Sequence, residues 1–132
     1  AAPAQLSTAE IAAVAGQYFS CLRNMEVDEL LELFSDDALS WDPVGTPPML
    51  VKDKSTNYFR ALSSIFEKMS LTEDDIFVAG DEAAIRWTGV AKLRSKQEEI
   101  SFEGISVFTV NDDGLISSVR SYWDKKGLMS SL

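Results

Sequence analysis

The chain has 132 residues, of which 45% are hydrophobic and 25% charged, the composition of one globular domain over residues 1–132. Twelve Lys and Arg against twenty-one Asp and Glu give a net charge of −9. This negative field opposes binding to nucleic acid and to anionic membranes. The chain has no histidine and one cysteine, Cys21, which excludes imidazole catalysis, an internal disulfide and a His- or Cys-based metal site. We therefore expect no metal and no cofactor.

No run of about 18 apolar residues is present, so we expect no membrane insertion. A single cysteine is typical of a reducing compartment, and we expect a cytoplasmic protein. The numbered chain begins with Ala1 rather than Met, and a targeting peptide removed earlier would leave no trace in it.

The first half of the chain predicts helices. Ser-Thr-Ala-Glu at 7–10 is a capping box, and the helix that it begins should run to about Arg23. A second short helix is expected over residues 27–35, ended by two consecutive aspartates, and a third over residues 52–68. Between them, residues 38–44 alternate as in a strand.

The second half predicts strands. Alternating apolar positions indicate strands over residues 83–93, 98–110 and 115–124, the last two joined by turn chemistry at 111–114. Ser106 is the one hydroxyl on the apolar face of the second of these strands. In the first helix, Tyr18 belongs to the apolar stripe that faces the core, where its hydroxyl needs a partner.

Helices followed by a meander of strands predict an α+β fold. We expect a cone-shaped, curved antiparallel sheet wrapped around three N-terminal helices and enclosing an apolar cavity. A mainly apolar cavity with few polar groups is the usual small-molecule site. Its polar candidates are Tyr18, Asp42 and Ser106. The predicted ligand-binding residues are aromatic, namely Trp87, Phe102, Phe108, Trp123, Phe59 and Phe66.

Several segments resemble the ketosteroid isomerase-like branch of the nuclear transport factor 2-like (SnoaL-like) superfamily. They are Leu-Phe-Ser-Asp-Asp-Ala at 33–38, Trp-Asp-Pro-Val-Gly-Thr-Pro-Pro at 41–48, Phe-Glu-Gly-Ile-Ser-Val-Phe at 102–108 and Tyr-Trp-Asp at 122–124, together with Tyr18. The resemblance covers nearly the whole chain. It implies that Asp42 is a general base beside a carbonyl group and that Tyr18 hydrogen-bonds the enolate oxygen.

The chain departs from that family at two positions. Ser106 stands where the family keeps a protonated carboxylic acid as its second oxyanion donor, and Phe59 stands where bacterial members often carry a supporting tyrosine. Loss of one oxyanion donor costs on the order of 10²–10³ in rate. A water molecule held by Ser106 would recover part of this loss.

Each candidate also has a purely structural explanation. Asp42 fits a turn residue before Pro43, Tyr18 fits a core aromatic, and Ser106 fits a small filler on a crowded face. The aromatic residues fit ordinary core packing. Paired acids elsewhere in the chain lack the spacing of a calcium loop and are explained by solvated turns.

The sequence supports two classes of function. The first is an isomerase or lyase that transfers a proton next to a carbonyl on a small apolar substrate such as a steroid, polyketide or terpene. The alternative is a non-catalytic module that binds a hydrophobic ligand or dimerises. A dehydratase or cyclase is a third possibility, although histidine-dependent dehydratases are excluded. The outer sheet face, with Val90, Ile105 and Val107, is expected to form a homodimer.

Overall fold

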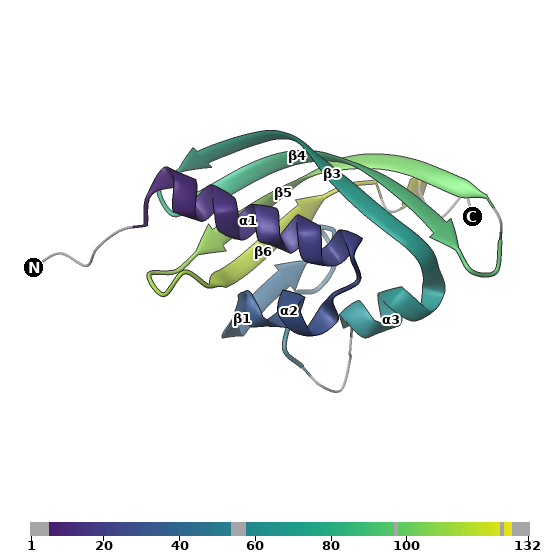
Figure 1. Cartoon of the computed structure of the whole chain (residues 1–132), viewed down its shortest axis with the longest axis horizontal. Helices are drawn as coiled ribbons and strands as arrows, with labels where there is room; N and C mark the ends of the chain where they lie inside the picture. Colours follow the sequence, from purple (N-terminus) through teal and green to yellow (C-terminus); the bar gives the residue numbers. More distant parts are fainter. Residues whose placement is uncertain (1–5, 54–57, 97, 125, 128–132) are drawn as a thin grey trace, which may run out of the picture.

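The computed structural model describes residues 6–53, 58–96, 98–124 and 126–127. Its elements, in chain order, are α1 (Thr8–Arg23), α2 (Val27–Glu32), β1 (Phe34–Trp41), β2 (Met49–Leu50), α3 (Tyr58–Ile65), β3 (Phe66–Ala79), β4 (Glu82–Leu93), β5 (Glu99–Val110) and β6 (Ile116–Tyr122). Figure 1 shows one curved, unclosed sheet with α1 lying along it, while α2 and α3 lie near β1 and the start of β3. The α+β class and the curved sheet are confirmed.

The sheet is mixed, which corrects the expectation of a wholly antiparallel one. Its strand order is β2-β1-β6-β5-β4-β3. All neighbours pair antiparallel except β1 and β6, which run parallel with Ser40 opposite Val119 and Trp41 opposite Arg120. Alternation within a strand reports its buried face but neither its partner nor its direction, so the sequence pattern does not reveal this pairing.

The second predicted helix is shorter than expected. α2 ends at Glu32, and β1 begins at Phe34, which is fully buried and pairs with Ile116. Asp36 and Asp37 therefore lie within β1 instead of ending a helix, and both are exposed. The apolar residues around Phe34 also suit a helix, but they form a strand because Phe34 pairs there with a buried partner.

The third predicted helix is also wrong at both ends. Residues 52–53 lie in or beside a turn, residues 54–57 fall outside the described part of the chain, and α3 covers Tyr58–Ile65. Phe66 begins β3, a strand of 14 residues that was not predicted from the sequence. Of its described side chains only Leu71 is buried. An edge strand that is mostly exposed carries no clear alternation, which explains why its pattern was not recognised.

The strand predicted over residues 38–44 lies instead at residues 34–41, so Asp42 follows it. The other predictions of secondary structure are confirmed to within two residues. In the cap of α1, Ser7 Oγ accepts from Glu10 N and Glu10 Oε1 accepts from Ser7 N, both at 3.1 Å. β4 and β5 match the predicted strands, and β6 is two residues shorter at its end and one at its start. Gly114 completes the β5–β6 turn with a φ of +79°, a conformation that glycine adopts without steric cost.

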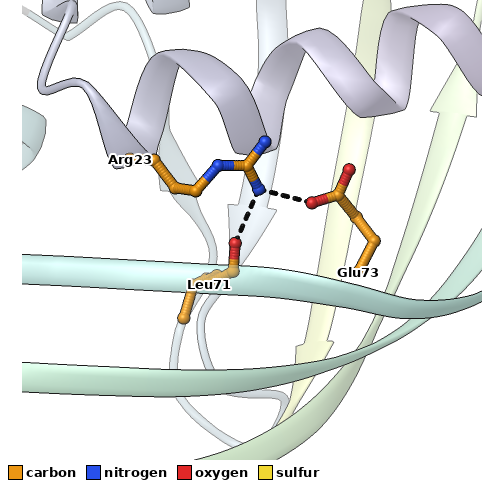
Figure 2. A network of polar contacts seen from close by, with 3 residues as sticks. All are labelled: Arg23, Leu71 and Glu73. Atoms are coloured by element: carbon orange, nitrogen blue, oxygen red, sulfur yellow. Dashed lines mark hydrogen bonds and ion pairs between the residues drawn. The ribbon is translucent and has the colours of Figure 1, made fainter.

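The last turn of α1 is fastened to β3 by Arg23. Its Nη1 donates to the carbonyl oxygen of Leu71 at 2.8 Å and contacts Glu73 Oε1 at 2.5 Å, as Figure 2 shows. The inner side of α1 is buried against the sheet through Ile11, Ala15, Tyr18, Phe19 and Leu22. Together these contacts place Tyr18 over the concave face of the sheet.

Candidate functional site

Tyr18 is held in place by aromatic rings. Its ring centroid lies 5.3 Å from that of Phe19, 6.1 Å from Phe34 and 4.9 Å from Phe108, all in edge-to-face arrangements. Burial raises the pKa of Tyr18 well above its ordinary value, and the negative charge of Asp42 raises it further. The phenol is therefore a neutral hydrogen-bond donor throughout the physiological pH range.

Asp42 follows directly after β1 and is half-buried. It continues the two-residue spacing of Ala38 and Ser40, which are buried on one face of β1, but it lies in the bend after the strand. The indole Nε1 of Trp123 donates to Asp42 Oδ1 at 2.6 Å across 81 residues of sequence. A hydrogen bond to an ionised carboxylate is worth about 1.5–3 kcal/mol, so this contact fixes the orientation of the carboxyl group.

Ser106 is buried and already hydrogen-bonded. Its Oγ accepts from the indole Nε1 of Trp87 at 2.9 Å and lies 2.9 Å from Ser121 Oγ. The register across the sheet explains this arrangement, because Ser106 lies opposite Ser121 on β6 and opposite Ile85 on β4. The expectation that Ser106 faces the concave side is met, and its hydroxyl is shared with two neighbours.

Two glycines make room for the neighbouring aromatic rings. A Cβ atom on Gly104 would lie 2.7 Å from Trp87 Cζ2, and one on Gly89 would lie 2.8 Å from Phe102 Cζ. Each ring therefore covers bare backbone of the adjacent strand, where Trp87 pairs with Gly104 and Gly89 with Phe102. This packing directs the indole N–H of Trp87 toward Ser106.

Most of the predicted aromatic residues belong to two series of ring contacts. Ring contacts run from Trp87 to Phe102 at 5.5 Å and from Phe102 to Trp123 at 6.1 Å. A second series links Tyr18 to Phe108 and Phe34, and Phe34 to Phe59 at 6.2 Å.

Phe66 is the exception among the predicted ligand-binding residues. It begins β3 opposite Leu93 and has no ring contact with either series within the described chain. The other five join the two series of ring contacts.

Ser121 is a further hydroxyl on this face that was not among the residues predicted from the sequence. Its position two residues before Trp123 and its alternation with Val119 place it on the concave face, so the period of β6 could have identified it. Its hydrogen bond with Ser106 could not be found that way, because it depends on the register between β5 and β6. With Ser121 included, Ser106 on β5 lies opposite Ser121 on β6, and Asp42 follows the end of the neighbouring strand β1.

One pocket lies away from these residues, at the end of the sheet formed by the β3–β4 and β5–β6 turns. It has a volume of about 270 Å³ and is lined by Leu6, Ile11, Gly80, Asp81, Val110, Asn111 and Asp112. None of the predicted site residues lines it. The cavity expected among Tyr18, Asp42 and Ser106 is therefore not this pocket.

Other chemical groups in the described chain offer little. No three Cys, Asp or Glu residues lie together in an arrangement that could hold a metal ion there. Burial, together with the charges of Glu26 and Glu29, raises the pKa of the Cys21 thiol, which disfavours a reactive thiolate. Within the same residues, the helices are too short or too polar to span a membrane.

The fold is shared with several solved enzymes. A protein from Silicibacter sp. described as a polyketide cyclase superposes with a TM-score of 0.82 at 20% identity, covering 96% of this chain and 98% of the other. An epoxide hydrolase/cyclase-like enzyme, SalBIII, of pyran ring formation in salinomycin gives 0.78 at 19% identity, covering 88% and 92%. An LEH-like epoxide hydrolase from M. tuberculosis gives 0.79 at 19% identity, covering 95% and 90%.

At these identities the structural matches show the fold alone. No curated protein sequence matches the chain significantly. The SnoaL-like domain family matches residues 15–119, from the middle of α1 to the middle of β6. The matched region includes Tyr18, Asp42 and Ser106. The chain therefore belongs to the SnoaL-like domain family of the nuclear transport factor 2-like superfamily.

Proposed function

We propose that the protein is an enzyme that transfers a proton at the carbon next to a carbonyl group of a small, neutral, apolar substrate. Asp42 is the general base, and Tyr18 is the principal donor to the oxygen of the enolate. The observation that carries this proposal is the carboxylate of Asp42, oriented by Trp123 and close enough to buried Tyr18 for its charge to raise the pKa of the phenol. A base held in position and a neutral hydrogen-bond donor are the two groups that enolisation requires.

The proposed reaction needs no cofactor. The Asp42 carboxylate takes a proton from the carbon, the electron pair of that C–H bond moves into the carbonyl group, and negative charge develops on the oxygen. The Tyr18 hydroxyl, kept protonated by its raised pKa, donates to that oxygen. Return of the proton from Asp42 to a conjugated carbon gives an isomer, while departure of a leaving group gives the product of a lyase.

The comparisons support small-molecule chemistry in this fold. The family that matches this chain belongs to one superfamily with the polyketide cyclase and the epoxide hydrolases named above. Steroid isomerisation is the finer proposal, and it depends on the resemblance around Asp42 and Tyr18. The negative net charge of the protein favours a neutral substrate over an anionic one.

A non-catalytic ligand-binding module is the alternative. The observation in its favour is that the Ser106 hydroxyl, which stands in for an acidic donor, is shared with Trp87 and Ser121. Both functions use the same concave face. The difference between them is chemical, because only the enzyme depends on the basicity of residue 42.

Hydrogen–deuterium exchange into a ketone tests the general proposal without knowledge of the natural substrate. With 2-tetralone in D₂O, we expect the wild type to speed exchange beside the carbonyl above the buffer rate. Asp42→Asn should abolish this acceleration but keep binding. Asp36→Asn, at an exposed carboxylate that pairs with Lys52, is the matched control and should behave as the wild type. Equal exchange by Asp42→Asn and wild type would reject Asp42 as the base.

Ultraviolet-monitored isomerisation of a Δ5-3-ketosteroid tests the finer proposal. We expect slow turnover by the wild type, none by Asp42→Asn and faster turnover by Ser106→Asp, because the last variant restores an acidic donor. Binding of the steroid without turnover in any of the three proteins would favour the non-catalytic alternative or a different substrate.

We also propose that the protein acts in the cytoplasm as a homodimer joined through the outer sheet face. Ile105 and Tyr122 pair across β5 and β6 and are 44% and 47% exposed, and Phe77 on β3 is 71% exposed. Exposed large apolar side chains are typical of protein interfaces. On the neighbouring strands β1 and β6, Trp41 and Arg120 make a cation–π contact, with the guanidinium carbon 5.8 Å from the ring centroid.

A further inference from the structure

Ser106 and Ser121 form a buried hydroxyl pair in the middle of the concave face. The two residues are only 3% and 5% exposed, and their Oγ atoms lie 2.9 Å apart. The one other hydrogen bond that their side chains make with described residues comes from Trp87 Nε1, at 2.9 Å from Ser106 Oγ. These contacts determine how many hydrogen atoms the pair can still donate.

The pair has one hydroxyl proton more than these contacts use. Each serine carries one O–H donor, and the indole N–H of Trp87 supplies its own proton to Ser106. The contact between the two hydroxyl groups consumes one serine proton, whichever of them donates. The second proton therefore needs an acceptor outside the pair, and a buried donor without one is unfavourable.

The contact with Trp87 favours one arrangement of these protons. An oxygen that accepts a hydrogen bond becomes a better donor, so Ser106 should donate to Ser121. The chain of donors then runs from Trp87 through Ser106 to Ser121, and the remaining proton is on Ser121.

The Ser121 hydroxyl, which carries this remaining proton, lies beside Asp42, the proposed base. Trp41 pairs with Arg120, and Val44 N donates to the carbonyl oxygen of Ser121 at 2.8 Å, so Asp42 lies alongside Ser121 on the adjacent strand. Neighbouring strands are about 4.8 Å apart. This spacing allows a bound ketone to place its carbonyl oxygen at Ser121 and the carbon next to the carbonyl group at Asp42.

We propose that the Ser121 hydroxyl is a ligand-binding donor, which binds the carbonyl oxygen of a neutral, fused-ring ketone whose adjacent carbon lies at Asp42. Ser106 is a positioning residue that directs and polarises Ser121. This inference rests on the proposed function, since it uses the same concave face and the same base. The surrounding rings of Trp87, Phe102 and Trp123 provide the apolar contacts for such a skeleton.

Paired ligands isolate the contribution of this hydroxyl. The probes are 2-tetralone, with its carbonyl labelled with ¹³C, and tetralin, which has the same rings without the oxygen. Affinity is measured by quenching of tryptophan fluorescence, and the carbonyl stretch of the bound ketone by infrared difference spectroscopy. Ser35→Ala is the matched control, because the Ser35 hydroxyl is also buried but donates to Asp37 at 2.8 Å.

For Ser121→Ala we expect about three- to tenfold weaker binding of 2-tetralone, unchanged binding of tetralin and a carbonyl stretch at higher frequency. Ser106→Ala should reduce the carbonyl shift in part, because Ser121 retains its own proton but is no longer polarised by Ser106. Ser35→Ala should match the wild type with both probes.

Three results would overturn the inference. They are an unmoved carbonyl stretch and unchanged ketone affinity in Ser121→Ala, loss of the shift in Ser106→Ala alone, and failure of the wild type to bind either probe. If Ser121→Ala also loses tetralin, Ser121→Cys preserves the size of the side chain and should weaken only ketone binding. Normal binding and infrared shifts without deuterium exchange would reject the proposed proton transfer while leaving the role of Ser121 intact.

Discussion

The packing of Trp87 over Gly104 predicts a large effect from adding one methyl group. In Gly104→Ala the new Cβ would lie 2.6 Å from the carbonyl oxygen of Tyr122 and 2.7 Å from Trp87 Cζ2. Unstrained carbon–carbon contacts are about 3.5–4.0 Å, so overlap occurs on two sides at once. The oxygen belongs to the backbone of β6, and the Trp87 ring is held by Ser106. Neither neighbour can withdraw freely.

The expected cost follows from these overlaps. Overpacking of a core costs about 1–3 kcal/mol, and contact with backbone places this site at the upper end. Replacing glycine recovers about 0.5–1 kcal/mol by restricting the unfolded chain. We therefore expect a net loss of about 2 kcal/mol in unfolding free energy, which lowers the melting temperature by roughly 6–10 °C for a domain of this size.

Urea unfolding followed by circular dichroism measures this loss. Gly16→Ala is the control, because Gly16 is within α1 and, apart from its own neighbours in the helix, no atom of the described residues lies within 4 Å of the added Cβ. We expect it to stabilise the protein by about 0.5–1 kcal/mol. Tryptophan fluorescence should change only in Gly104→Ala, where the indole of Trp87 is displaced from Ser106. A Gly104→Ala protein as stable as the wild type would refute the described packing.

The remaining predictions concern titration, an ion pair and the outer face. The pKa of Tyr18 is raised in the folded state, so above about pH 10 the unfolded state releases a proton that the folded state keeps. The unfolding free energy of the wild type should therefore fall with rising pH, and its slope should exceed that of Tyr18→Phe by up to about 1.4 kcal/mol per pH unit. Equal slopes of the two proteins in urea unfolding would contradict the raised pKa. Arg23→Ala should lower the unfolding free energy by about 1–2 kcal/mol, because the contacts with Leu71 and Glu73 are lost. Arg60→Ala removes an exposed ion pair and should change it by less than about 0.5 kcal/mol. Equal losses in the two variants would contradict the role of Arg23 in holding α1 against β3. In sedimentation velocity, Ile105→Glu should turn the proposed dimer into monomers, and a monomeric wild type would reject that dimer.

Some features of the candidate site follow from the local sequence, and others do not. The helical stripe of α1 places Tyr18 toward the core, and the alternation of β5 places Ser106 on the buried face, since both depend on periods of a few residues. Those two placements were predictable. The contacts of Trp123 with Asp42 and of Ser106 with Ser121 were not, because they span 81 and 15 residues and depend on strand order and register.

Composition and local pattern by themselves determined an acidic chain with an α+β fold and no histidine, the cap of α1 and the strands β4 to β6. Tertiary structure alone decided that residues 34–37 form a strand and that β3 follows α3 directly. It also decided that β1 runs parallel to β6, which brings Asp42 alongside Ser121. The physical reason is that periodicity fixes which side of an element is buried, whereas the partner and direction of a strand depend on long-range packing.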